Sequence, residues 1–392
     1  MQLPVRRAFI GREAATVARL CGTCGAARRQ FASSAKLPQP LAAGLTELKS
    51  RRLLSVTGSD AGKFLQGIVT ADVTPSKGGP RHEGFYSAFL TATGRILNDV
   101  FIYPMAAGSP TGEGFLIEVD AGQAKRLEKL IKRYKLRADV GVRSLPSDEA
   151  NVWHAWDDAQ SGQLVLPSNS SRMTMQDPRV PGLGHRIIQF NNNRPEVDLN
   201  QTDEAAYTIR RYLHGVPEGQ DEILREHSLP LETNMEYMNG IEFRKGCYVG
   251  QELTIRTKHR GVVRKRILPC VIYPKDRPAP DTLSYRDPSD ASNSPDAVAA
   301  EMIPTETSIG RFEKRGRSAG KWLKGVGNIG LALCRLEIMT DILLPGEQSA
   351  STFTEGDEFT LEWGEETVKE GVKVKAFVPE WLRRAMDASA AH

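Results

Sequence analysis

Residues 245–252 have the sequence KGCYVGQE, the segment of the chain that is most informative about its fold. Gly246 and Gly250 predict a tight loop, because glycine adopts backbone conformations that other residues avoid. Between them stands Cys247, with Lys245 two residues before it. We expect this cation to stabilise the thiolate, the form of cysteine that binds metals and attacks electrophiles. The alternative is a small apolar side chain that fills a turn.

The other residues of this segment are expected to support the cysteine. Tyr248 is predicted to pack beneath the loop. Gln251 and Glu252 are expected to hydrogen-bond the loop amides or a partner. For Glu252, the alternative is an ion pair with Arg244 or Arg256.

The remaining four cysteines provide no second metal ligand. Cys21 and Cys24 fall in an N-terminal segment that we expect to be cleaved. Cys270 and Cys334 stand in apolar runs and are predicted to be core residues. The histidines are scattered, without the spacing of a zinc site. The sequence therefore reveals no self-contained metal site.

Positive charge is concentrated at one end of the chain. The 392 residues carry a formal net charge of +4, with a pI near 8.7. Residues 1–31 hold six arginines and one acid, a net +5, which leaves −1 for the rest. Nucleic-acid binding needs concentrated Lys and Arg to contact phosphates. The near-neutral body therefore argues against a nucleic-acid partner.

Residues 1–31 have the composition of a mitochondrial targeting sequence. They are rich in arginine, poor in acids, and lack the continuous apolar core of a secretory signal. Arg29, followed by Gln30 and Phe31, predicts processing near Ala32 and a mature protein in the mitochondrial matrix. The alternative is a disordered basic arm that stays on the protein. No segment approaches the ~18 apolar residues of a membrane span, so membrane insertion is not expected.

From about residue 50, strand-like and helix-like segments alternate. Apolar residues spaced by three and four predict a helix capped by Asp120, with Leu127 and Tyr134 on its buried face. Its other face is strongly basic, which indicates either a solvated surface or a docking site for an acidic partner. A second helix is predicted over 204–213, ending at Gly215. Segments with strand character are 51–58, 86–104, 114–120, 152–156, 163–167, 184–190, 266–273, 330–338, 357–363 and 372–378.

Three further stretches point, with KGCYVGQE, to a known family. They are LLSVTGSDAGKFLQGIVTADV (53–73), YSAFLTATGRILNDVFIY (86–103) and LPLETNMEYMNGIEF (229–243). Together with residues 245–252, they resemble the YgfZ-type branch of the folate-binding aminomethyltransferase superfamily. Its mitochondrial members are assembly factors for 4Fe-4S clusters.

The resemblance implies an α+β fold with two regions. A two-lobed body of the folate-binding type, similar to the aminomethyltransferases, would surround a central cavity and span residues 45–258. A small C-terminal β-barrel would span residues 259–380. Within it, the segment at about 275–322 is rich in Pro, Ser and Asp and is expected to be a mobile insertion.

The resemblance also implies a function. An iron-sulfur cluster takes four protein ligands, so a cluster that contacts Cys247 would need the others from outside this chain. The expectation is an assembly factor for mitochondrial 4Fe-4S proteins. It would act with an A-type scaffold, and Cys247 would contact a 2Fe-2S cluster shared by the two proteins. Such a factor, a monomer when alone, would have no turnover of its own. In a weaker version the loop is only a docking surface.

A tetrahydrofolate-dependent aminomethyltransferase is the main alternative. By resemblance, Asp72, Asp99 and Arg211 are candidates for a folate cavity. Such enzymes often have two adjacent acids where this chain has Asn98 before Asp99, and a Glu two residues after the position of Arg211. Here that second position is Leu213, which leaves pterin donors without a charged acceptor.

Two further alternatives stay open. A cysteine-nucleophile enzyme would need a base, for which His259 is the nearest histidine in the sequence. The chain could also be a pure interaction module.

Overall fold

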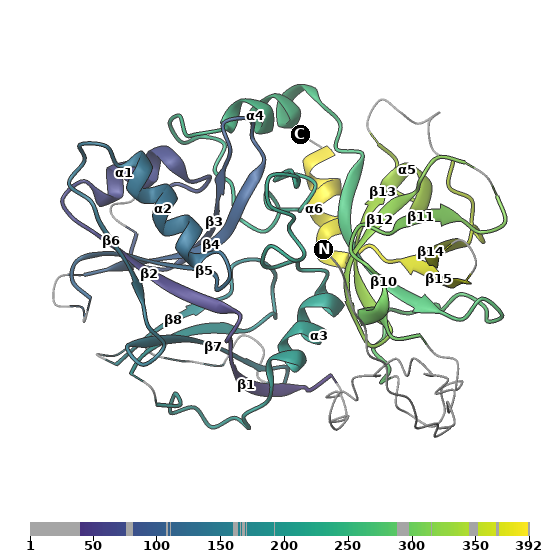
Figure 1. Cartoon of the computed structure of the whole chain (residues 1–392), viewed down its shortest axis with the longest axis horizontal. Coiled ribbons are helices and arrows are strands. Elements are labelled where there is room, and N and C mark those ends of the chain that lie inside the picture. Colours follow the sequence, from purple (N-terminus) through teal and green to yellow (C-terminus); the bar gives the residue numbers. More distant parts are fainter. Residues whose placement is uncertain are drawn as a thin grey trace, which may run out of the picture. The chain divides into compact units, whose positions relative to one another are not determined.

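The computed structural model shows two antiparallel sheets and a closed barrel (Figure 1). The residues described are 40–390, except for 76–80, 107–108, 110, 160–163, 165, 167–168, 170, 192, 288–297, 315, 345–351 and 366–367. The predicted targeting sequence, with Cys21 and Cys24, lies outside the described residues. The prediction of an α+β fold is confirmed, because the sheets are antiparallel and the helices lie between or over them.

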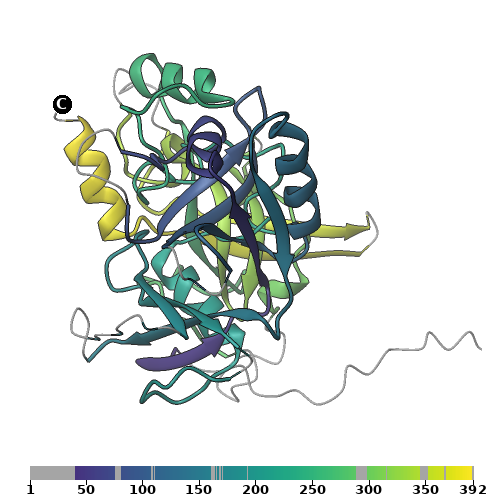
Figure 2. The same ribbon diagram turned by 90° about the vertical axis from the view of Figure 1, so that its left-hand side faces the viewer.

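Five strands form the first sheet, in the order β3-β4-β5-β2-β6. Their bounds are β2 Arg51–Thr57, β3 Phe85–Leu90, β4 Ile96–Met105, β5 Gly114–Asp120 and β6 Gly141–Leu145. Two helices, α1 (Ala61–Ile68) and α2 (Ala124–Tyr134), cover one face of this sheet (Figure 2). Leu65 of α1 and Leu127 and Ile131 of α2 share one apolar core with the strands.

Four strands form the second sheet, in the order β1-β7-β9-β8. Their bounds are β1 Ala43–Glu47, β7 Ala150–Asp157, β8 Arg172–Gln176 and β9 His185–Phe190. Helix α3 (Glu204–His214) follows this sheet in the chain. It begins where the carboxylate of Asp203 accepts the amide of Ala206, and it ends at Gly215, whose φ of 70° suits glycine.

Six strands close into the barrel, in the order β10-β13-β12-β11-β14-β15. The strands are β10 Lys265–Tyr273, β11 Ser308–Arg311, β12 Gly320–Val326, β13 Ile329–Arg335, β14 Phe359–Glu365 and β15 Val368–Ala376. The neighbouring helices are α4 Gln251–Arg260, η1 Ala300–Met302, α5 Leu336–Met339 and α6 Glu380–Ala390. Trp381 of α6 donates its indole N–H to the carbonyl of His214 at 2.9 Å, which links the barrel region to α3.

The barrel core contains the two cysteines that the sequence predicted to be buried. Cys270 and Cys334 have no exposed surface, and their sulfur atoms lie 3.9 Å apart. Burial raises the pKa of the Cys270 thiol. The prediction that both are core residues is confirmed.

The start of α2 differs from the sequence prediction. The helix begins at Ala124, because Asp120 is the last residue of β5 and its carboxylate is used elsewhere. It accepts the amide of Gly122 at 2.8 Å and the amide of Gln220 at 3.3 Å. Asp120 therefore ties the end of a strand to a distant loop and does not cap the helix.

Two expected segments also differ in the structure. The second half of the expected mobile insertion, residues 298–322, contains β11 and buries Ile309 and Trp322 in the barrel core. Residues 288–297 of that insertion lie outside the described residues. The strand expected over 163–167 is not formed by the residues of that segment that the structure describes.

Candidate functional site

The KGCYVGQE segment forms a loop held against the end of α1. The amide of Val249 donates to the carbonyl of Gly67 at 3.1 Å. Gly250, with a φ of 80°, precedes α4, and a Cβ there would lie 2.2 Å from the carbonyl oxygen of Thr91. Only glycine fits at this position without moving the neighbouring backbone. At Gly246, in contrast, a Cβ would meet nothing within 4 Å. The loop geometry therefore requires glycine at Gly250, as expected, but not at Gly246.

Lys245 fixes the loop to the body. Its Nζ donates to the carbonyls of Gln66 and Val69 at 2.8 Å and of Ala71 at 2.7 Å. Burial lowers the pKa of Lys245 to about 8, against the opposing effect of Asp72. All three donors of the ammonium thus face backbone oxygens. The structure gives Lys245 a positioning role, in place of the predicted contact with the thiolate.

Cys247 is exposed at the surface of this loop. The other two cysteines of the described residues are buried in the barrel. Among the described side chains, no group of three or more His, Cys, Asp or Glu is arranged to hold a metal ion. Cys247 is therefore an available thiol without companion ligands in the part of the chain that the structure describes.

Three further residues of the segment support the loop. Tyr248 is buried beneath it with its ring centroid 5.1 Å from the Lys245 ammonium, and burial raises the pKa of this phenol to about 12. Gln251 accepts the amide of Tyr248 through Oε1 at 3.3 Å. Glu252 is exposed in the first turn of α4, where a negative charge favours the helix dipole. Within the described part of the chain, it forms no ion pair with Arg244 or Arg256.

Of the three candidates for a folate cavity, Asp72 lies apart from the other two. Asp72 lies near Lys245, and its carboxylate accepts the side-chain amide of Gln66 at 2.8 Å. Asp99 and Arg211 belong to a buried network that we call the interior ion-pair cluster. Its members are Arg51, Asp99, Glu118, Asp177, Arg179, Arg186, Arg211, Glu218 and Glu222.

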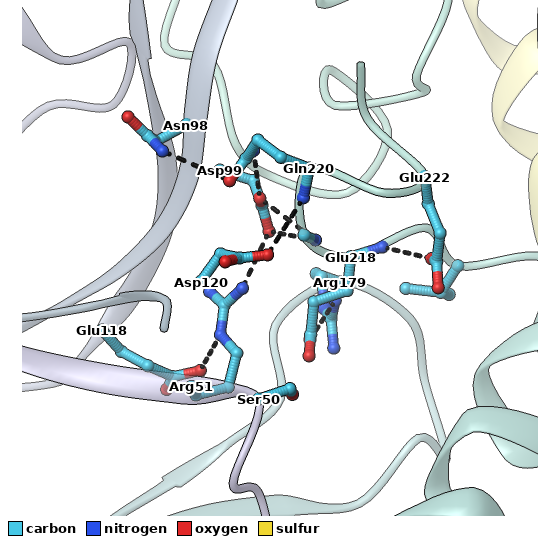
Figure 3. Close-up of polar contacts among 12 residues, drawn as sticks. Ser50, Arg51, Asn98, Asp99, Glu118, Asp120, Arg179, Glu218, Gln220 and Glu222 are labelled. Atoms are coloured by element: carbon cyan, nitrogen blue, oxygen red, sulfur yellow. Dashed lines mark hydrogen bonds and ion pairs between the residues drawn. The ribbon is translucent and has the colours of Figure 1, made fainter. Parts of the chain in front are cut away.

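The interior ion-pair cluster joins the two sheets. Arg186 of β9 pairs with Glu118 of β5 and with Glu218, and its Nε lies 3.3 Å from Asp177. Arg51 of β2 lies between Glu118, at 2.9 Å, and Asp99 (Figure 3). The cluster therefore fixes the relative position of the two lobes of the body.

The opposite charges of this cluster are paired, although both terminal nitrogens of Arg51 have no hydrogen bond to the described residues. Burial alone would raise the pKa of Glu218, but the guanidinium groups of Arg186 and Arg179 outweigh it and hold this pKa well below its usual range. Arg211 pairs with Glu222 at 2.7 Å. Since most members are fully buried, removing one would leave its partners as uncompensated charges.

Asp99 also accepts hydrogen bonds from neutral donors. The amide of Gly219 lies 3.2 Å from one of its carboxylate oxygens, and Gln220 donates to the same oxygen at 3.0 Å (Figure 3). A pocket of about 170 Å³ lies beside the cluster, lined in part by Arg51, Arg211 and Glu218. Ligand pockets usually measure at least ~300 Å³. The arrangement suits a structural core better than a site for a molecule as large as a folate.

Sequence reasoning missed most of the interior ion-pair cluster. Arg179, Arg186, Glu218 and Glu222 were not among the expected site residues. The one available signal was a charged residue inside an apolar strand, such as Glu118 in FLIEVD. Such a residue is normally interpreted as facing solvent.

Comparison with curated proteins identifies the family. A chain from Pyricularia oryzae is 56% identical over 355 residues, covering 89% of this chain and 87% of its own length. One from Chaetomium globosum is 50% identical over 399 residues, covering 95% and 90%. Both are named "Iron-sulfur cluster assembly factor IBA57 homolog, mitochondrial". The chain belongs to the IBA57 family.

Two other comparisons concern the fold of this IBA57 family member. The family model described as "CAF17, C-terminal beta-barrel domain" matches residues 264–384. The crystal structure of glycine cleavage system aminomethyltransferase T from Bartonella henselae aligns with a TM-score of 0.58, covering 86% of each chain. At 13% identity, this second likeness shows the fold alone. The predicted aminomethyltransferase-like body with a C-terminal barrel is confirmed.

The names of the relatives agree with the location expected from residues 1–31. They place the IBA57 homologues in mitochondria. The matrix location and the cleavage near Ala32 stay predictions. None of the helices in the described part of the chain is long and apolar enough to cross a membrane.

Proposed function

We propose that this chain is an assembly factor for mitochondrial 4Fe-4S proteins that acts with an A-type scaffold. In this proposal, the thiolate of Cys247 is one ligand of a 2Fe-2S cluster shared by the two proteins. The observation that carries the proposal is the exposed thiol on a loop whose backbone is fixed by Lys245 and Gly250. The names of the relatives support the general role in iron-sulfur cluster assembly.

The coordination chemistry of iron-sulfur clusters supports a cluster that is shared by two proteins. A cluster needs four ligands, mostly thiolates, and Cys247 has no companion ligand among the described residues. The missing ligands would then come from outside the chain, from the partner protein or from a small thiol. A loop that is already ordered loses little conformational entropy when it joins the partner. Lys245 therefore contributes to the function by keeping Cys247 in place.

Anaerobic size-exclusion chromatography with absorption detection tests the proposal. The chain is mixed with an A-type scaffold, iron and sulfide, as wild type and as Cys247→Ser. Gly246→Ala is the matched control, because it lies in the same loop and a methyl group there meets no neighbour. We expect a coloured complex with wild type and the control, and none with Cys247→Ser.

The other outcomes separate the alternatives. If Cys247→Ser gives the same coloured complex, the thiol is not a required ligand and the loop only docks. If neither protein associates with the scaffold, the assembly proposal loses its physical basis. A titration with tetrahydrofolate then tests the aminomethyltransferase alternative. The hydrogen bonds of Asp99 within the chain and the small volume of the pocket argue against this alternative.

A further inference from the structure

Helix α2 presents a continuous cationic face to solvent. At about 100° per residue, five of its side chains fall within an arc of roughly 120°. They are Lys125, Arg126, Lys129, Lys132 and Arg133, and all are exposed. Leu127 and Ile131 point the opposite way into the core of the five-stranded sheet. The helix is thus anchored by one face and leaves the other free to contact a partner.

Lys132 and Arg133 lie in the last turn, where the helix dipole favours cations, but the other positions are unfavourable. Lys125 lies in the first turn, where the positive end of the helix dipole disfavours a cation, and the first turn has no acid. Lys129 stands four positions from both Lys125 and Arg133, and like charges at this spacing repel each other. In the described helix the only intrahelical ion pair is Lys132 with Glu128, at 2.7 Å. An anionic partner would relieve this repulsion.

A second feature at the end of α2 is independent of charge. Leu136 follows the C-cap residue Lys135 with a φ of 46°, in the left-handed region where Gly or Asn is the usual choice. Its side chain is 85% exposed, and the nearby Tyr134 is 40% exposed. A leucine here adds backbone strain, and the described residues leave most of its side chain exposed. An apolar surface that covered this side chain would remove it from water.

We infer that the cationic face of α2, together with Leu136, is a docking surface for an anionic lipid bilayer. Exposed cations are attracted to anionic headgroups, and each strengthens binding roughly fivefold. An apolar side chain next to them can enter the boundary between headgroups and acyl chains. An acidic protein surface would also match the cations and is the alternative that the vesicle experiment separates. This binding would be peripheral, and it does not depend on the role of Cys247.

Vesicle sedimentation tests the inference. One set of vesicles is phosphatidylcholine alone, and the other contains about 20% cardiolipin as the anionic lipid. The chain starting at Ala32 is used beside the full chain, because the arginines of residues 1–31 would themselves bind anionic vesicles. Residues 36–392 form a compact unit of their own, so the shorter chain keeps the folded body. We expect both chains to sediment with anionic vesicles only, and more weakly as salt screens the charges.

Charge-reversal variants locate the surface. The triple variant Lys125→Glu, Lys129→Glu, Arg133→Glu is expected to weaken binding at least ~100-fold. The matched control reverses three exposed cations of α4, namely Arg256, Lys258 and Arg260. Circular dichroism confirms that each variant is folded. The inference is overturned if the α2 variant binds as well as wild type, or if the α4 variant loses as much binding.

Leu136→Gly separates membrane docking from a structural role. Glycine relieves the left-handed strain, so the variant should be at least as stable as wild type. Its vesicle binding should nevertheless fall by roughly tenfold. Leu343→Ala, another exposed leucine in the chain, is the control and should leave binding unchanged. If wild type does not bind anionic vesicles at all, the inference fails and an acidic protein becomes the occupant to test.

Discussion

The interior ion-pair cluster and the KGCYVGQE loop are both polar, but they differ in what their polar groups face. In the cluster, every guanidinium faces a carboxylate of the same chain, as Arg186 faces Glu118 and Glu218. In the loop, the one buried cation holds the backbone and the thiol of Cys247 is left exposed. Groups that satisfy one another build a structure, whereas an unmatched group on a fixed backbone is available to a partner. Perturbing each region should therefore affect different measurements.

The largest loss of stability should come from breaking the cluster. Arg186→Met removes one of the two guanidinium groups that face each of Glu118 and Glu218 and leaves an excess of buried negative charge, which should lower the free energy of unfolding by about 3–5 kcal/mol. Urea denaturation followed by circular dichroism measures the loss. Arg143→Met is the control, because the pair of Arg143 with Glu149 is half-exposed and should contribute less than ~1 kcal/mol. Equal losses for the two variants would mean that the cluster does not hold the lobes together.

The next largest effect should distinguish the two glycines of the loop. Gly250→Ala forces a side chain into left-handed backbone and against the Thr91 carbonyl, which should lower the free energy of unfolding by about 1–3 kcal/mol. Gly246→Ala should change it by less than ~0.5 kcal/mol. Thermal denaturation of both variants measures the difference. Similar melting temperatures would show that the loop can rearrange and is not fixed at Gly250.

Between pH 7 and pH 5, a pH dependence of stability should arise from the interior. Burial and the neighbouring Arg186 lower the pKa of His154 to about 3. Between this value and the ordinary pKa near 6.5, the unfolded chain binds a proton that the folded chain does not, so stability falls as the pH falls. Between pH 7 and pH 5 the loss should be about 2 kcal/mol.

Urea denaturation at several pH values measures this slope. His154→Phe removes the titrating group while keeping a ring beside Tyr207. The slope between pH 7 and pH 5 should then flatten. An unchanged slope would assign the acid sensitivity to other groups.

The smallest stability effect should come from the residue with the largest expected functional effect. Cys247→Ser alters an exposed side chain, so the free energy of unfolding should change by less than ~0.5 kcal/mol. Urea denaturation of the same preparation used for the scaffold experiment measures it. A large destabilisation would mean that a lost cluster complex reflects unfolding and says nothing about the thiol.

The sequence predicted local features well where the cause lies within a few residues. The end of α3 at Gly215 and the turn at Gly250 depend on glycine itself. Prediction from the sequence failed where the hydrogen-bond partner of a residue is far away in the chain. Asp120 looked like a helix cap because its partner, the amide of Gln220, is a hundred residues away in the chain.

The candidate site was predictable only in part, for the same reason. The exposure of Cys247 and the packing of Tyr248 follow from residue types in one loop. The partners of Lys245 are backbone carbonyls, which carry no residue-specific signal in a sequence. Glu118 and Arg186 are 68 residues apart, and only the pairing of the two lobes makes them neighbours.

The position of β1 has a consequence for how the chain folds. This first strand pairs with β7, so Leu45, fully buried in the fold, meets its partners only after residues 150–157 are present. Synthesis proceeds from the N-terminus, which leaves β1 with an unpaired edge while the five-stranded sheet is already being completed. Unpaired edges of this kind attract other chains. Nascent or truncated chains that end before β7 would therefore be the species most in need of a chaperone.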